Sequence, residues 1–378
     1  MRNCIATYST WTTGNDESWR IFDHPCPTTE PGTVGRMLRN FMEMGVRCPV
    51  VLYPAPFSPE IERHMVEVTA GFDLDLHIFT SHEMRRIRAL LRDHGFPAEL
   101  ETALDLANYG RYRNWMLLYA ALKGYDNVVQ IDDDELIETP DFLARCERDL
   151  GDDFEGRPIW GKSGCYIGPD GSKYYDGQIR GFKDWPKDEM FNEAVKRMLA
   201  GPGGRLLPCT VAFGGNMVIN RRLFLNVPYD INIPRGEDDD YVANAQYRGF
   251  TFVFDRDLTV RHLPPGRAGL FWTRMRQDIR RFQYLREKAR LLGRQPNECN
   301  VFYDYFLQDD LERKAVIGSL DAARTYMDSH RAEALEFLAN AELAVSIRPE
   351  ELRAQVERQV RFMDAWAAVL PKIVGLWA

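Results

Sequence analysis

The sequence predicts an open, mainly parallel α/β sheet flanked by helices, followed by an α-helical C-terminal module. Two observations lead to this fold class. Short apolar runs typical of strands alternate with helical stretches through the first half of the chain, as in βαβ units. From about Asp309 onward the pattern is helical only, and Leu352, Val356, Val360 and Met363 are spaced along one helix face.

The expected elements of the first half follow from apolar runs and from the residues that begin and end them. We expect strands over 4–8, 49–53, 74–79 and 127–131, alternating with helices over 34–44, 61–70 and 114–122. Gly124 ends the third of these helices, because glycine is the usual C-terminal cap. Thr139 and Pro140 indicate the start of a further helix, which Gly151 ends.

The middle of the chain is richer in turns. A Pro169-Asp170-Gly171 turn between β-prone flanks predicts a hairpin over 161–177. Further strands are expected over 206–213, 217–220 and 250–255, with a helix over 239–248. We expect one sheet domain over residues 1–305 and a separate helical module over 306–378.

Composition and charge exclude several classes of protein. The chain has 378 residues, 45% of them hydrophobic, which excludes disorder. Its 48 basic and 56 acidic residues give a net charge of −8, which argues against nucleic acid as a partner. The 7 cysteines are scattered without a CxxC pair, so we expect reduced thiols. No signal peptide or membrane-spanning run is recognisable, and a cytoplasmic location is expected.

The C-terminal tail from Ala365 to Ala378 is apolar apart from Lys372. We expect it to pack against its own domain. A peripheral membrane contact, or a homodimer formed through the C-terminal helices, is the alternative.

The sharpest local signal is the run of carboxylates that follows the apolar strand Val128–Ile131. Because side chains alternate along an extended chain, Asp132 and Asp134 can share one side while Asp133 faces the other. Open α/β sheets place ligands at the carboxyl ends of their strands, and a divalent cation lowers the cost of clustered acids. The run therefore predicts Mg²⁺ or Mn²⁺ binding a diphosphate. A solvated acidic turn that caps the next helix is the alternative.

Two further features come later in the chain. Gly236-Glu237-Asp238 and the two aspartates after it precede a predicted helix, where carboxylates are stabilised by the positive end of the helix dipole even without a catalytic role. His262, between an extended run and a Pro-Pro-Gly loop, could supply a nitrogen ligand to a metal, although a lone histidine is more often structural. Arg267 could contact phosphate oxygens.

In this order, these segments resemble the GT-A class of nucleotide-sugar-dependent glycosyltransferases, and most closely the inverting family 2 type. The resemblance spans roughly Arg111 to His262. An Arg113-Asn114 pair precedes Asp132 by 19 and 18 positions, as in that family. The other matching segments are the DxD motif Asp132-Asp133-Asp134, the Gly214-Gly215-Asn216 segment that leads into a strand, the Gly236-Glu237-Asp238 motif, and His262.

The resemblance implies a GT-A fold whose residues 1–135 bind the donor and whose residues 136–305 form the acceptor half. Asp238 would be the general base, and Glu237 would orient the helix or the acceptor. The expected metal ligands are Asp132, Asp134 and His262, and the expected donor contacts are Thr7, Arg113, Asn114, Asp132, Asp133 and Arg267. Gly215, Asn216 and the aromatic Trp160 are expected on the acceptor side, where the acceptor is a hydroxyl of a glycan or a small molecule.

One segment departs from the family. Family 2 enzymes commonly carry Asp-Asp-Gly-Ser after the second strand, whereas Val51–Ser58 contains no acidic residue, so the donor base stays open. Other readings also stay open: a retaining enzyme of the same fold, a haloacid-dehalogenase-type phosphatase, and a non-catalytic binding module. The phosphatase family also has an Asp-x-Asp after a strand, but it has Thr or Val where Leu136 stands here.

Overall fold

The computed structural model describes residues 1–14, 18–174, 182–265, 270–293 and 301–377. The chain forms two compact units. The first contains residues 1–173, 202–267 and 361–378, and the second contains residues 174–201 and 268–360. The helical unit thus begins well before the expected boundary at residue 306, and the end of the chain groups with the first unit.

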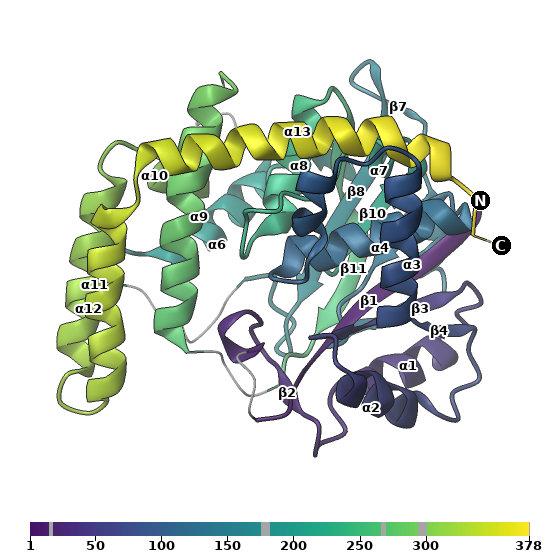
Figure 1. The fold of residues 1–378 in the computed structure, drawn as a ribbon, viewed down its shortest axis with the longest axis horizontal. Helices are drawn as coiled ribbons and strands as arrows, with labels where there is room; N and C mark the ends of the chain where they lie inside the picture. Colours follow the sequence, from purple (N-terminus) through teal and green to yellow (C-terminus); the bar gives the residue numbers. More distant parts are fainter. Residues whose placement is uncertain (15–17, 175–181, 266–269, 294–300, 378) are drawn as a thin grey trace. The chain divides into compact units, whose positions relative to one another are not determined.

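The first unit is a sheet with helices on both faces (Figure 1). Its strands are β1 (Asn3–Thr12), β2 (Cys26–Pro27), β3 (Val50–Ala55), β4 (Leu76–Ile78), β5 (Asn127–Gln130), β6 (Glu135–Ile137), β7 (Asp153–Phe154), β8 (Arg157–Ile167), β9 (Leu206–Pro208), β10 (Met217–Asn220) and β11 (Thr251–His262). The main path of the sheet runs β4-β3-β1-β5-β10-β8-β11-β6. The first four strands are parallel, and so are β8 and β11, whereas β10 is antiparallel to both of its neighbours and β6 is antiparallel to β11. The predicted α/β open sheet is confirmed.

Helices of the first unit cover the two faces of this sheet. They are η1 (Ser18–Arg20), α1 (Val34–Glu43), α2 (Pro59–Thr69), α3 (Ser81–Asp93), η2 (Ala98–Leu104), α4 (Tyr109–Lys123), α5 (Phe142–Glu147), α7 (Arg221–Phe224) and α8 (Glu237–Tyr247). One core joins α1, α2 and α5 to the alternate strand residues Ile5, Leu52 and Val129. On the opposite face, Trp115 and Tyr119 of α4 meet the ring of Phe79.

Helix α4 is apolar on nearly all sides and almost wholly buried, which is the pattern of a central helix rather than a surface one. It begins where the side chain of Asn108 accepts a hydrogen bond from the backbone N–H of Arg111. It ends at Gly124, whose φ of 68° is the left-handed conformation of a glycine cap. The predicted helix and its stop are confirmed, with a start earlier than the apolar run indicates.

Three sequence predictions for the middle of the chain are wrong in part. The hairpin over 161–177 is absent from the described residues: β8 is one strand that pairs with β10 and β11, and residues 175–177 lie outside the described part. The buried stretch of β8 makes its backbone hydrogen bonds with these two strands, which are distant in the sequence, rather than with the other arm of a hairpin. The strand expected over 206–213 covers only Leu206–Pro208, and the helix after Pro140 covers only Phe142–Glu147.

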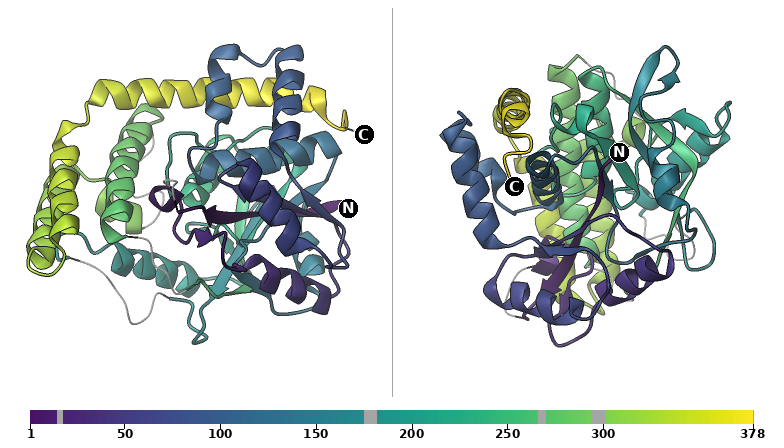
Figure 2. Two further views of the ribbon diagram at one scale, coloured as in Figure 1. Left: turned by 60° about the horizontal axis from the view of Figure 1, so that its bottom comes forward. Right: turned by 90° about the vertical axis from the view of Figure 1, so that its right-hand side faces the viewer.

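The second unit is helical. Its helices are α6 (Lys187–Ala200), α9 (Phe271–Leu291), α10 (Val301–Phe306), α11 (Leu311–Tyr326), α12 (Arg331–Ser346) and the first part of α13 (Pro349–Ile373). Helices α11 and α12 lie side by side (Figure 2). The buried Asn340 of α12 donates to the carbonyl of Trp272 in α9 at 2.9 Å. The predicted helical C-terminal region is therefore confirmed, and α9 extends it toward the N-terminus.

The apolar tail packs within the first unit, whereas the sequence analysis places it in the helical module over 306–378. Trp366 is fully buried and its indole N–H donates to the carbonyl of Phe224 at 2.8 Å. The guanidinium of Arg86 lies 4.2 Å from the centre of the Trp377 ring. Within the described residues, no helix has the length and apolar character needed to cross a membrane.

The described cysteines are free thiols, as the sequence predicts. Burial raises the pKa of the Cys48 thiol to about 11, which suppresses the reactive thiolate form at neutral pH. Cys299 lies outside the described residues.

Gly164→Ala should destabilise the first unit. A Cβ at this position would overlap the carbonyl oxygen of Leu258, at the point where the register of β8 and β11 shifts. We expect unfolding free energy to fall by about 3 kcal/mol, because backbone cannot yield as a flexible side chain does. Urea unfolding measures this. Gly204→Ala, where the added Cβ meets open space, is the control and should change stability far less.

Candidate active site

The predicted acidic run lies at the carboxyl edge of β1 and β5. These strands are parallel, with Ala6 opposite Gln130. Two residues beyond that pair, the hydroxyl of Tyr8 donates to Asp132 at 3.2 Å. One residue further, the hydroxyl of Ser9 donates to Asp133 at 2.5 Å. Since Tyr8 and Ser9 face opposite sides of β1, Asp132 and Asp133 also face opposite sides, as strand alternation predicts.

Asp134 and His262 are neighbours. His262 is the last residue of β11, opposite Glu135 of β6 in the sheet. Its Nε2 lies 3.4 Å from Oδ2 of Asp134, and its ring stacks on Tyr166 with 4.9 Å between ring centres. Burial alone would lower the pKa of His262, but the hydrogen bond and charge of Asp134 raise it. Two of the three predicted metal ligands thus lie together at the strand ends.

Arg113 joins the separate parts of the site. Its side chain is only 2% exposed, and it projects from α4 toward the end of β5. The Nε donates to Glu237 at 2.7 Å, and Nη2 lies 3.3 Å from Asp132. The Nη1 donates to the carbonyl of Gly214 at 2.9 Å and to Gln130 at 3.2 Å. One guanidinium therefore links α4, β5, the segment before β10 and α8.

Asp238 lies in the first turn of α8, beside this network. Its Oδ2 accepts a hydrogen bond from the backbone N–H of Gly214 at 2.9 Å, and its Oδ1 accepts from the N–H of Asp239 at 2.9 Å. These two contacts fix the carboxylate orientation but leave lone pairs on both oxygens. Gly214 is also the residue whose carbonyl holds Arg113, so Asp238 and Asp132 contact the same short network.

Glu135 is a fully buried carboxyl group behind the acidic run. Its Oε2 accepts from the backbone N–H of Asp132 at 2.9 Å, and its Oε1 has no hydrogen-bond partner. A Cβ on Gly215 would overlap this carboxyl group, so the segment comes this close only because residue 215 is glycine. The Gly215 N–H donates to the hydroxyl of Tyr166 at 2.7 Å.

The buried acids of the site lie close together and repel one another, so the site favours a bound positive charge. Burial, and then the charge of Asp134, raises the pKa of Asp133 to about 7. Burial, and then the charges of Asp132 and Asp134, raises the pKa of Glu135 well above its ordinary value. A bound cation would relieve the mutual repulsion that these shifts reflect.

A divalent cation fits this chemistry only together with oxygens of a ligand. Among the described residues, no three His, Cys, Asp or Glu side chains are arranged to hold a metal by themselves. Asp134 and His262 supply two adjacent donors, one oxygen and one nitrogen. Mg²⁺ is usually bound by one or two carboxylates plus phosphate oxygens of a substrate, and imidazole is also accepted by Mn²⁺ and related metals.

Several predicted site residues lie away from this cluster. Thr7 is fully buried, and its hydroxyl is 3.9 Å from the sulfur of Met37 in the core. Asn114 is fully buried and exchanges two hydrogen bonds with the backbone of Tyr229, at 3.0 and 2.8 Å. The structure thus gives these two side chains internal partners rather than access to a donor.

The predicted acceptor residues also lie in different places, and not all of them are at the site. Asn216 donates to the carbonyls of Leu258 at 3.0 Å and Cys165 at 3.2 Å, which fastens β8 to β11. Gly215 lies in the site, against Glu135. Trp160 precedes Gly161, which pairs with Ile219, so it lies level with the first residue of β5, at the opposite edge from Asp132. Arg267 lies outside the described residues.

Sequence reasoning assigned no role to Tyr8, Ser9 and Glu135. The alternation of β1 beside a parallel β5 could have indicated Tyr8 and Ser9, because parallel neighbours end at one edge. Glu135 directly extends the acidic run. Tyr166 reaches the site through the pairing of β8 with β11.

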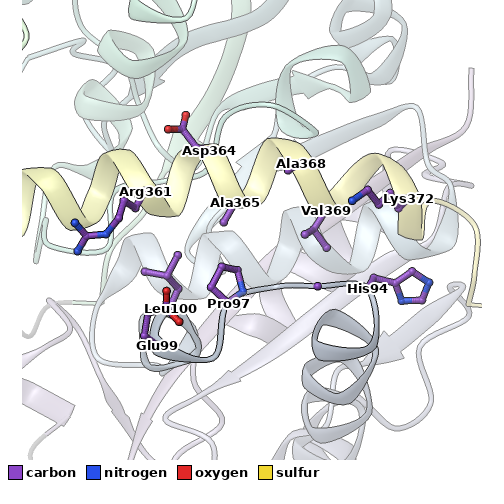
Figure 3. Close-up of a pocket in the computed structure, with 11 residues that line it drawn as sticks. His94, Pro97, Glu99, Leu100, Arg361, Asp364, Ala365, Ala368, Val369 and Lys372 are labelled. Atoms are coloured by element: carbon purple, nitrogen blue, oxygen red, sulfur yellow. The ribbon is translucent and has the colours of Figure 1, made fainter.

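A shallow groove elsewhere in the first unit is separate from the acidic cluster (Figure 3). Residues 94–100 line one side, and residues 361–372 of α13 line the other. Arg361 lies across the groove from Glu99 at one end, and Lys372 lies across from His94 at the other (Figure 3). Asp364 on its margin is paired with Arg248 at 2.6 Å. The groove has charges of both signs and none of the predicted site residues.

Arg113→Met should destabilise the protein strongly. Removing the guanidinium leaves Glu237 and Asp132 close together without their shared cation, and breaking a buried pair in this way costs about 3–5 kcal/mol. Denaturant unfolding measures the loss. Arg92→Met is the control, because Arg92 is 52% exposed and its pair with Glu101 should contribute less than about 1 kcal/mol. Equal effects of the two substitutions would contradict the role given to Arg113.

Comparisons with known proteins return solved structures only. No protein-family model and no curated protein matches the chain. The chain is similar to the mannosyltransferase PcManGT from Pyrobaculum calidifontis, solved with GDP-Man and Mn²⁺, at 16% identity and a TM-score of 0.48, over 100% of this chain and 87% of that one. It is also similar to glucosyl-3-phosphoglycerate synthase from Mycobacterium tuberculosis with Mn²⁺ and UDP-glucose, at 12% identity and a TM-score of 0.40, over 78% and 80% of the two chains. Both of these structures were solved with a nucleotide sugar and Mn²⁺.

Proposed function

We propose that this chain is a metal-dependent glycosyltransferase of the GT-A class. It transfers a sugar from a nucleoside-diphosphate sugar to a hydroxyl group of a glycan or small-molecule acceptor. One observation carries the proposal: the Asp134–His262 pair lies at the carboxyl end of parallel strands, beside Asp132. Open α/β sheets bind ligands at this edge, and an acidic edge needs a cation before it can accept a diphosphate.

Asp134 and His262 are the residues that would hold Mn²⁺ or Mg²⁺ together with the donor diphosphate. When bound, the cation would neutralise the negative charge that develops on the departing nucleoside diphosphate. Asp132 is oriented by Tyr8 and Arg113 and would face the donor. In this proposal residues 1–135 form the donor-binding half and residues 136–305 the acceptor half, from which His262 reaches the cation beside Asp134.

Asp238 is the proposed general base. Its two hydrogen bonds from backbone N–H groups orient the carboxylate, and its remaining lone pairs can accept the proton of the acceptor hydroxyl. Glu237 is engaged by the guanidinium of Arg113 at 2.7 Å, so its role is to fix the start of α8 rather than to accept the proton. Direct attack by the deprotonated hydroxyl inverts the configuration at the sugar carbon.

A titration with nucleotides tests the proposal. Calorimetry with UDP, GDP and dTDP, each with and without Mn²⁺, should show metal-dependent binding of at least one of them and so reveal the donor base. Turnover is then followed with a panel that includes GDP-mannose and UDP-glucose. The absence of nucleotide binding with Mn²⁺, combined with phosphate release from simple phosphomonoesters, would establish a phosphatase instead. The absence of both would leave a binding module.

Asp134→Ala should abolish metal-dependent binding of the nucleoside diphosphate. The substitution removes one of the two adjacent protein donors and leaves His262 alone beside the strand end. Calorimetry with Mn²⁺ measures the effect. The exposed Asp73, in the turn before β4, supplies the control: Asp73→Ala should bind as the wild type does. Unchanged binding by the Asp134 variant would refute the metal site.

Asp238→Asn should keep donor binding and lose transfer. The amide has nearly the same shape but cannot accept the proton, and general-base contributions are typically 10²–10⁴-fold, so we expect a fall in kcat of roughly that size. Transfer is followed by chromatography of the product, and proton NMR of its anomeric centre reports inversion or retention. Wild-type rates in this variant, or retained configuration in the product, would exclude the base role.

A further inference from the structure

Helix α1 is fastened to β6, the strand at one end of the main sheet path. The buried Asn40 of α1 donates to the carbonyl of Ile137 in β6 at 3.0 Å and accepts from the N–H of the same residue at 2.8 Å. Arg36 lies one helical turn earlier, on the same face of α1, because residues four apart are neighbours on a helix. Glu135 lies two residues before Ile137 and is opposite His262 in the sheet. One helical turn and two strand residues each span about 5–7 Å, so Arg36 can reach the strand end that carries the candidate site.

The guanidinium of Arg36 contacts the residue that directly follows His262. Its Nη2 donates to the backbone carbonyl of Leu263 at 2.6 Å. The N–H of Leu263 donates in turn to the backbone carbonyl of Asp134 at 2.9 Å. A single residue therefore joins the Arg36 side chain to the Asp134–His262 pair, and hydrogen bonds fix this placement at each step.

Arg36 keeps donors that no other part of the described chain uses. A guanidinium has five N–H donors. Among the described residues, the carbonyl of Leu263 is its one hydrogen-bond acceptor, and no carboxylate forms an ion pair with it. Its Nε is buried there without a partner, and the residue as a whole is half-buried. Partial burial of an unpaired charge costs free energy, and a bound anion would offset that cost.

Other arginines of the elements around the site already have acidic partners. These pairs are Arg113 with Glu237 and Asp132, Arg235 with Asp23, and Arg261 with Glu138. Arg36 therefore differs from them in having its charge available to a ligand. The ligand proposed for this edge of the sheet carries two phosphate groups, which are the anions that an arginine fork binds best.

We propose that Arg36 is a further donor-binding residue, whose guanidinium contacts a phosphate oxygen of the nucleoside-diphosphate sugar. The inference rests on the proposed function and deepens it. Asp134 and His262 hold the cation side of the diphosphate, and Arg36 donates to the diphosphate from the side of α1. The planar fork of arginine allows one nitrogen to keep the carbonyl of Leu263 while others bind phosphate oxygens, which a lysine could not do with the same geometry.

Arg36→Met tests the inference, and Arg39→Met is the matched control. Arg39 is an exposed residue of the same helix, so both substitutions remove one positive charge from α1. Calorimetry measures the affinity of each protein for UDP, for GDP and for inorganic pyrophosphate, all with Mn²⁺. We expect Arg36→Met to bind the preferred nucleoside diphosphate and pyrophosphate about 10- to 100-fold more weakly, because it loses a hydrogen bond to a charged group. Arg39→Met should match the wild type.

A spectroscopic measurement distinguishes a phosphate contact from a role in holding Leu263. The electron paramagnetic resonance spectrum of Mn²⁺ reports the groups that surround the cation. At nucleotide concentrations that saturate each protein, we expect the same spectrum for Arg36→Met and the wild type. The thermal unfolding midpoint should also stay at the wild-type value.

The outcomes separate this inference from the proposed function. Affinities of Arg36→Met within about twofold of a wild type that does bind the diphosphate would overturn the role of Arg36 and leave the function standing. An equal loss of affinity in Arg39→Met would also overturn it, because the effect would then come from net charge.

Two further results are decisive. A changed Mn²⁺ spectrum at saturation would overturn the inference, because Arg36 would then act by placing Leu263 and the histidine before it. A wild type that binds no diphosphate would refute the function itself. Should Arg36→Met unfold at a lower temperature, the same titrations and spectra of Arg36→Gln decide.

Discussion

The candidate site depends on one buried guanidinium. Arg113 holds Glu237 and Asp132, which would otherwise repel each other, and at the same time binds the carbonyl of Gly214. A lysine could not make these contacts, because it lacks the planar fork of five donors. Burial of this charge is tolerable only because its donors are satisfied by oppositely charged and polar partners. The acidic strand end and the start of α8 are brought together by this residue.

The sequence was sufficient for those features that are coded locally. The alternation of apolar runs predicted the strands β1, β3, β4, β5, β10 and β11 and the helices between the early ones. The acidic run is a property of consecutive residues, so its place at the end of β5 followed from strand alternation. Gly124 and Asn108 are local signals as well. The sequence analysis uses only the glycine, so it predicts the end of α4 but not its start.

Features that depend on pairing between distant segments could not be read in the same way. Asn216 and Trp160 are polar or aromatic residues near recognisable motifs, but the register of β8, β10 and β11 decides which edge they reach. Thr7 lies on the face of β1 that packs on α1, and only the position of that helix shows that its hydroxyl is enclosed.

The end of the chain has a consequence for synthesis. The N–H groups of Gly375 and Trp377 donate to the carbonyls of Ala121 and Leu122, in the last turn of α4, where helix carbonyls lack partners within the helix. Helix α4 is also the element from which Arg113 projects. Because a ribosome releases residues in order and domains fold as they emerge, the first unit cannot reach its final hydrogen-bonded state until residues 375–377 have left the ribosome.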